Sequence, residues 1–190
     1  MEAQKQFSAA VLAGGYSSRM GRDKAALSFG GTTMLDQQVR KLRSVGIEDI
    51  MISGSELAVS GTRYVPDVFP HRGPLSGIHA CLQAARGKSV LFLSVDVPLV
   101  PVEALSALLD AHANGVTLIR HGDRIEPLIG VYDRTLLRIC EKILGSDKTA
   151  VKQLLEHASV HTILRADNEL FYTNCNTEAD YLFLCSHNER

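Results

Sequence analysis

The sequence has few cysteines and no long hydrophobic run. Its four cysteines, Cys81, Cys140, Cys175 and Cys185, form no CxxC pair and have no histidine at zinc-finger spacing. This pattern favours small core residues in a reducing compartment over a disulfide framework or a zinc site. The longest apolar run, around residues 90–93, is far shorter than the ~20 residues of a membrane-spanning helix.

The chain also has no large excess of charge of either sign, because 20 lysines and arginines balance 21 acidic residues for a net charge of −1. Without an overall basic field, neither nucleic acid nor an anionic membrane is an expected partner. The polar residues 1–6 lead directly into a strand-like segment, unlike a secretory signal peptide. We therefore expect a cytoplasmic protein, and its 190 residues fit one domain, 1–190.

Hydrophobic periodicity predicts alternating strands and helices in the first part of the chain. Strands are expected at 7–12, 50–52, 63–65 and 90–95, and helices at 33–45, 75–85 and 103–113. This order predicts an α/β fold with a doubly wound, mostly parallel, Rossmann-like sheet. Two strand-like runs, 116–119 and 125–132, flank turn residues and predict a small antiparallel excursion. The expected elements after it are helices at 134–144, 148–157 and 177–185, and a strand at 160–164.

A loop with three glycines and two cations follows the first strand. Gly14, Gly15 and Gly21 would let backbone N–H groups approach phosphate oxygens, and Arg19 and Lys24 would neutralise a polyanion. The carboxyl end of a strand is where open α/β sheets bind ligands. The spacing fits neither a Walker loop nor GxGxxG. The residues alone leave open a triphosphate cradle or a glycine turn with solvated cations.

Three further segments carry polar groups with two interpretations each. Asp96 follows the strand at 90–95 and would either bind Mg²⁺ at the edge of the sheet or cap the next helix. Asp67 and the turn at 73–77 offer acceptors and backbone N–H groups to a guanine base, or simply form a turn and a helix start with Pro74 at its first position. Asn174 and Asn176 would face one cleft or only make turns, with Thr177 as a helix N-cap.

The complete strings resemble a known superfamily. LAGGYSSRMGRDK, residues 12–24, resembles the signature of the sugar-nucleotide and cofactor nucleotidyltransferases, which reads LAGG or LAAG, then x-S-x-R-M-G, then Lys. LSVDVP, at 93–98, resembles their strand-Asp-x-Pro metal motif, and NCNT, at 174–177, resembles their NxNT motif. Within the superfamily the chain is most similar to the molybdenum cofactor guanylyltransferase (MobA) family.

The resemblance implies a set of site residues. Arg19, Lys24 and Asp96 would be catalytic, with Asp96 also the ligand of Mg²⁺. Lys148, Asn174 and Asn176 would bind the acceptor, and Glu126-Pro127 would shape its pocket. The nucleotide would contact Leu12, Ala13, Gly14, Gly15, Lys24, Ser53, Asp67, Gly73, Pro74, Leu75, Gly77 and Asp96.

The chain departs from the family pattern at three positions. Ser53 stands where Asn is usual and has a shorter reach, while Lys148 replaces an Arg and loses its bidentate fork. Glu178 replaces the Pro after NxNT, which suits the first turn of a helix. Of the seven histidines, only His71 lies in a predicted nucleotide loop.

The activity implied by the resemblance is transfer of GMP from GTP to the terminal phosphate of molybdopterin, with Mg²⁺ and release of pyrophosphate. Gly14 in LAGG and Pro74-Leu75 in GPLSG are typical of the GTP-using branch. Residues 1–100 would form a nucleotide-binding half and 101–190 an acceptor-binding half. Expected partners are GTP, molybdopterin and, transiently, cofactor-biosynthesis proteins or molybdoenzymes. The alternatives are a cytidylyl- or other nucleotidyltransferase acting on a related cofactor or sugar phosphate, and a nucleotide-binding module without turnover.

Overall fold

The computed structural model describes residues 7–14, 23–146, 149–165 and 168–188. The strands are β1 (Phe7–Leu12), β2 (Ser28–Phe29), β3 (Thr32–Thr33), β4 (Ile50–Ser53), β5 (Thr62–Tyr64), β6 (Ser89–Ser94), β7 (Val116–His121), β8 (Arg124–Asp133) and β9 (Val160–Leu164). The α-helices are α1 (Met34–Ser44), α2 (Pro74–Ala84), α3 (Val102–Ala111), α4 (Leu137–Leu144), α5 (Val151–Glu156) and α6 (Glu178–Asn188). Short 3₁₀ turns are η2 (Lys24–Ala26), η3 (Arg134–Leu136) and η4 (Glu169–Tyr172).

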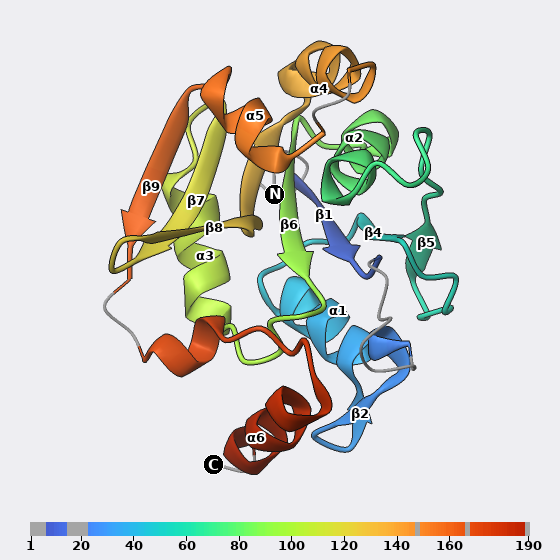
Figure 1. The fold of residues 1–190 in the computed structure, drawn as a ribbon, viewed down its shortest axis with the longest axis vertical. Coiled ribbons are helices and arrows are strands. Elements are labelled where there is room, and N and C mark those ends of the chain that lie inside the picture. The colour runs from blue at the N-terminus through green and yellow to red at the C-terminus, as the bar shows by residue number, and fades with distance from the viewer. Residues whose placement is uncertain (1–6, 15–22, 147–148, 166–167, 189–190) are drawn as a thin grey trace.

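In the described residues, seven strands form one sheet in the order β5-β4-β1-β6-β8-β7-β9, and β2 and β3 form a separate hairpin. Figure 1 shows the sheet from β9 at the left edge to β5 at the right. The pairs β5-β4, β4-β1, β1-β6 and β7-β9 are parallel. Only β8 runs antiparallel to its neighbours. The predicted α/β class with a mostly parallel sheet is therefore confirmed.

The β7–β8 hairpin belongs to the sheet itself, because β8 lies between β6 and β7. The β7–β8 pairing is irregular: Leu118 pairs with Gly130, but the next residue, Ile119, pairs with Glu126. The intervening residues 127–129 form a bulge in β8. Bulges of this kind redirect side chains and are common beside active sites, and Leu128 in this bulge faces the cavity described below.

Helices cover both faces of the sheet, and β1 shows why its sequence reads as one continuous apolar run. Ala9 and Val11 face the core formed with α1 and α3, whereas Ala10 and Leu12 face the core formed with α2, α4 and α5. A strand buried on both faces needs apolar residues at every position. The two cores leave the carboxyl ends of β1, β4 and β6 together at one edge of the sheet.

The C-terminal helix returns to this same edge. Figure 1 shows α6 next to the β2–β3 hairpin, far in sequence from it. Tyr181 Oη donates a hydrogen bond of 2.5 Å to the backbone carbonyl of Ser28. The segment that precedes α6, with Asn174 and Asn176, is thereby placed beside η2 and the residues that follow β6.

The predicted elements all occur, with shifted ends. The helix predicted at 148–157 is the shorter α5, and the hairpin strands extend further into the turn than predicted. The sequence did not predict η2, β2, β3 or η4, because elements of two to four residues carry no readable periodicity. In the described residues no helix is both long and apolar enough to cross a membrane.

The cysteines have the predicted structural role. All four are free, and Cys81, Cys140 and Cys175 are buried. Burial raises the pKa of the Cys81 and Cys140 thiols to about 12, so both remain protonated near neutral pH.

Candidate active site

A cavity of about 600 Å³ lies at the carboxyl ends of β1, β4 and β6. This is the edge at which open α/β sheets bind ligands, because the strand order changes direction there. The lining residues come from the ends of these strands, the α2 entrance and the β8 bulge: Leu12, Gly14, Ser53, Gly54, Asp67, His71, Gly73, Pro74, Gly77, Ser94, Asp96 and Leu128.

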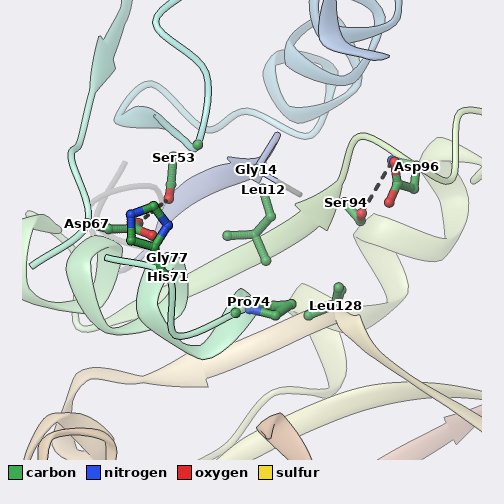
Figure 2. A pocket seen from close by; sticks show the side chains of 12 residues that line it. Leu12, Gly14, Ser53, Asp67, His71, Pro74, Gly77, Ser94, Asp96 and Leu128 are labelled. Atoms are coloured by element: carbon green, nitrogen blue, oxygen red, sulfur yellow. Dashed lines mark hydrogen bonds between the residues drawn. The ribbon is translucent and has the colours of Figure 1, made fainter. Parts of the chain in front are cut away.

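The cavity has two polar ends separated by an apolar stretch. Figure 2 shows Ser53, Asp67 and His71 at one end and Ser94 and Asp96 at the other, with Leu12 and Pro74 between them. Ser53 Oγ donates a hydrogen bond of 3.1 Å to Asp67 Oδ1. A carboxylate can accept about four hydrogen bonds, so Asp67 keeps acceptor capacity for a ligand. An elongated ligand with a hydrogen-bonding ring and a charged tail fits this division.

Backbone packs directly on backbone where the loops after β1 and β4 meet. Ala13 N donates to Ser53 O at 2.8 Å. A Cβ added to Gly54 would lie 2.1 Å from Gly14 Cα, and Gly54 has a φ of +85°. Only glycine fits here, for both space and backbone conformation. The contact fixes the position of Ala13 and Gly14 relative to Ser53.

Gly77, in the first turns of α2, permits a second close approach. A Cβ at this position would lie 2.7 Å from Ser53 Oγ and 3.2 Å from Leu12 Cδ2. The absence of a side chain lets α2 lie against the ends of β1 and β4. The helix N-terminus, with Gly73 as N-cap and Pro74 at its first position, lines the cavity, so the positive end of the helix dipole lies nearby.

Polar groups from three distant segments, two of them charged, meet at the other end of the cavity. Lys24 Nζ lies 3.0 Å from Asp96 Oδ1 and donates a second hydrogen bond of 3.1 Å to Asn176 Oδ1. The Lys24 side chain is 13% exposed and that of Asp96 is 30% exposed. The fold therefore holds a cation and a carboxylate together beside the cavity.

Neighbouring backbone positions both members of this pair. Asp23 accepts a hydrogen bond of 3.0 Å from Ala25 N and caps η2, which begins at Lys24. Asp96 O accepts a hydrogen bond of 2.7 Å from Cys175 N, which joins the C-terminal segment to the end of β6. Asp96 does not cap a helix, since α3 begins later, with Pro101 as its N-cap. That alternative interpretation of Asp96 is wrong.

Thr177 caps α6, as predicted. Thr177 Oγ1 accepts a hydrogen bond of 3.1 Å from Asp180 N, and Asp180 Oδ2 accepts bonds from the backbone N–H groups of Thr177 and Asn176 at 2.8 and 2.9 Å. Burial opposes ionisation of Asp180, but these hydrogen bonds lower its pKa overall. The negative Asp180 at the helix N-terminus fixes the backbone of Asn176, whose side chain contacts Lys24.

Comparison with known proteins identifies the family of this chain. Residues 9–163 match the model of the MobA-like NTP transferase domain. The chain belongs to this family. It is 33% identical to a probable molybdenum cofactor guanylyltransferase of Carboxydothermus hydrogenoformans, over 90% of this chain and 91% of that protein.

Solved structures share the fold. Molybdopterin-guanine dinucleotide biosynthesis protein A of Archaeoglobus fulgidus superposes with a TM-score of 0.78 at 20% identity, over 96% of this chain and 98% of that one. A protein of Mycobacterium tuberculosis, solved as a complex with manganese, superposes with a TM-score of 0.68 at 20% identity, over 95% and 98% of the two chains.

Most of the nucleotide contacts expected from the family pattern line the cavity. They are Leu12, Gly14, Ser53, Asp67, Gly73, Pro74, Gly77 and Asp96, with Lys24 paired to Asp96. The other two described residues in that prediction, Leu75 and Ala13, do not line the cavity: the Leu75 side chain is 0% exposed in the core under α2, and Ala13 packs into the core on the opposite face of the sheet. Helical spacing turns Leu75 away from the cavity that its neighbour Pro74 lines. Gly15, Arg19 and Lys148 lie outside the described residues.

The residues predicted on the acceptor side lie in different surroundings. Asn176 contacts Lys24, whereas Asn174 lies two residues earlier in the same extended segment, half-buried. In the β8 bulge Leu128 lines the cavity, while Glu126 pairs with His121 at 2.9 Å. Sequence reasoning missed Gly54, Ser94 and Leu128. Strand alternation could have revealed Ser94, because it points to the same side as Asp96 two residues later.

The donor set at Asp96 fits some metals and not others. Among the described residues no group of three or more His, Cys, Asp or Glu side chains could hold a metal ion. A closed zinc or calcium site would need such a group. A single half-buried carboxylate instead suits Mg²⁺ or Mn²⁺, which take most of their ligands from phosphate oxygens and water.

His71 has an unusual backbone conformation in the cavity wall. Its φ is +64°, the one positive φ at a non-glycine residue in the described ranges. We expect His71→Gly to lower the free energy of unfolding by less than glycine does at a neighbouring position with negative φ, because relief of about 1 kcal/mol of left-handed strain offsets part of the added entropy of the unfolded chain. The control is Val68→Gly in the same loop, where φ is negative; it should cost about 0.5–1 kcal/mol. Urea denaturation measures the free energy of unfolding of both variants, and an equal decrease in both would contradict the prediction that backbone strain is relieved at residue 71.

Proposed function

We propose that the protein transfers GMP from GTP to the terminal phosphate of molybdopterin, releases pyrophosphate and forms the guanine dinucleotide cofactor. The observation that carries the proposal is the pairing of Lys24 with Asp96 at 3.0 Å, beside a cavity built at the carboxyl edge of the sheet. A nucleotide-binding module without turnover would have no need to hold this pair at the Asp96 end of the cavity, where we place the phosphates.

The nucleotide assignment rests on both ends of the cavity. Guanine presents N–H donors beside a carbonyl acceptor, and the end with Ser53 and Asp67 offers acceptors beside the N-terminus of α2, the positive end of its dipole. The LAGG and GPLSG strings, typical of the GTP-using branch, contribute Gly14 and Pro74 to this cavity. Relatives named as guanylyltransferases over nearly the full chain support the same assignment.

The reaction is an in-line displacement at the α-phosphorus of GTP. An oxygen of the acceptor's terminal phosphate forms the new P–O bond as the bond to the β-phosphate bridging oxygen breaks, and pyrophosphate leaves with that electron pair. The nucleophile is already anionic near neutral pH, so no general base is needed. The catalytic contribution of the protein is positioning and neutralisation of charge.

Lys24 has the central role among the described side chains. Its ammonium group is held by Asp96 and Asn176 before substrate binds, so little side-chain entropy remains to be lost when it contacts phosphate oxygens. We propose that Arg19 also neutralises the negative charge of the phosphate oxygens. Asp96 would hold Mg²⁺, which would supply Lewis-acid polarisation of the α-phosphorus when bound.

We assign the acceptor to the half of the chain that follows residue 100. Asn176 reaches the Lys24–Asp96 pair from this half, and Leu128 contributes the β8 side of the cavity. Asn174 and Lys148 would complete the acceptor site, with Lys148 near its phosphate. Residues 1–100 would bind the nucleotide.

The test follows the label from the nucleotide into the product. The protein is incubated with molybdopterin, Mg²⁺ and either α-³²P-GTP or α-³²P-CTP. We expect label in a dinucleotide product with GTP at a rate at least about tenfold above that with CTP, because guanine and cytosine present different hydrogen-bonding edges. Faster labelling from CTP would replace the guanylyl assignment with a cytidylyl one, and no labelling from any nucleoside triphosphate would refute the transferase proposal.

A further inference from the structure

The chain leaves the sheet just before Asp96 and enters a short segment, residues 94–98, that we call the Asp96 loop. Val95 and Val97 in this loop are buried. Val95 N still donates to Leu12 O at 3.0 Å, but the carbonyl groups beyond β6 have left the sheet ladder. A buried carbonyl without a donor costs about 1–3 kcal/mol, so this loop needs donors from elsewhere in the fold.

Gln38 of α1 supplies two of these donors. Its side-chain Nε2 donates to Ser94 O at 2.8 Å and to Val97 O at 3.0 Å. The two accepting carbonyls lie on either side of Asp96, and both N–H bonds of the amide are used. Gln38 is 0% exposed, so water does not compete for these hydrogen bonds.

Lys41, one turn further along α1, makes a third contact with the loop. Its Nζ donates to the backbone carbonyl of Pro98. Burial lowers the pKa of Lys41 to about 8, so at neutral pH the group is still mainly protonated and able to donate. The same face of α1 therefore contacts the Asp96 loop before, directly after and two residues after Asp96.

Gln38 lowers the free energy of unfolding at this position relative to an apolar residue, unless its hydrogen bonds compensate. The rest of this helix face is apolar, with Leu35, Val39 and Leu42 in the core. The side-chain oxygen of Gln38 is buried without a hydrogen-bond partner among the described residues. A buried amide with an unsatisfied oxygen costs free energy that an apolar side chain would avoid. The two hydrogen bonds that Gln38 donates are what it contributes to the structure, and both go to the Asp96 loop.

We propose that Gln38, assisted by Lys41, is a positioning residue that fixes the Asp96 carboxylate in the orientation needed to hold the divalent cation. This inference rests on the proposed role of Asp96 as the metal ligand. Gln38 is buried and does not line the cavity; it acts by restraining the backbone before and after Asp96, at Ser94 and Val97. From the opposite side, Cys175 N restrains the Asp96 carbonyl itself.

The test is Mn²⁺ binding, measured by the loss of free-ion EPR signal in the presence of GTP and the absence of acceptor. Gln38→Met keeps the length of the side chain and removes both donors. We expect its Mn²⁺ dissociation constant to rise by about 10–100-fold, the usual effect of losing an outer-shell contact. Gln37→Met changes the neighbouring glutamine on the same helix, which makes no hydrogen bond to the Asp96 loop within the described residues, and its dissociation constant should stay within about twofold of wild type.

Two further variants make each outcome decisive. Lys41→Met removes the contact with Pro98 at a half-buried site and should raise the dissociation constant by a smaller factor, even if Gln38→Met fails to fold. Asp96→Asn tests the metal role itself. If Asp96→Asn weakens Mn²⁺ binding while Gln38→Met and Lys41→Met bind as wild type, the positioning role is refuted and the proposed function stands. If Asp96→Asn binds Mn²⁺ as wild type, the assignment of Asp96 as the metal ligand is refuted, and the positioning role that rests on it is refuted as well.

Discussion

Asp96→Asn is expected to lower the rate of nucleotidyl transfer by roughly 10³-fold or more, since a metal contributes several kcal/mol of charge stabilisation to such a reaction. The replacement is nearly isosteric and removes the carboxylate charge. The backbone contact with Cys175 and the bond from Lys24 to Asn176 do not involve the Asp96 side chain, so the fold should persist. Pyrophosphate release with GTP, Mg²⁺ and molybdopterin measures the rate.

The matched control for this variant is Glu103→Gln, which removes an exposed carboxylate in the first turn of α3, away from the cavity. Its turnover should be that of wild type. Circular dichroism and urea denaturation of both variants show whether a lost rate reflects chemistry or folding. Turnover of Asp96→Asn within tenfold of wild type would refute the assignment of this residue as the metal ligand.

Gly54→Ala is expected to destabilise the protein by at least about 4 kcal/mol, at the upper end of single substitutions. The new Cβ would lie 2.1 Å from Gly14 Cα and 2.2 Å from Gly14 N. Both obstructing atoms belong to backbone, so no side-chain rotation relieves the clash, and the two loops must separate. A positive φ adds about 1 kcal/mol for any residue with a side chain.

Gly31→Ala isolates the conformational part of that loss. Gly31 has a φ of +77°, close to the +85° of Gly54, but no atom lies within 4 Å of its added Cβ. It should cost only about 1 kcal/mol. Urea denaturation of the two variants compares them directly, and equal losses would mean that the close approach of Gly14 and Gly54 contributes nothing.

These predictions draw on different kinds of information. Asp96 was identifiable in the sequence, because a carboxylate directly after a buried strand is placed at the ligand-binding edge by the architecture alone. Gly54 was not. Its importance comes from contact with Gly14, a residue forty positions earlier, and the sequence holds no signal for which two loops meet.

Gln38 illustrates the same limit inside a helix. The pattern of α1 predicted its apolar face, and a glutamine within that face reads as an interruption of it. Its partners are the carbonyls of Ser94 and Val97, more than fifty residues away, and backbone groups leave no trace in a sequence. The β8 bulge that brings Leu128 to the cavity likewise depends on the register between two strands.

The sequence by itself determined the order of strands and helices, the parallel core of the sheet and the candidate groups at its carboxyl edge. Local periodicity and turn chemistry suffice for these, because they depend on neighbouring residues. Only the tertiary structure decided that Lys24, Asp96 and Asn176 meet at one point and that Leu75 faces the core. It also decided the support of the Asp96 loop from α1. Such facts depend on distances between segments remote in sequence, which are set by packing of the whole chain.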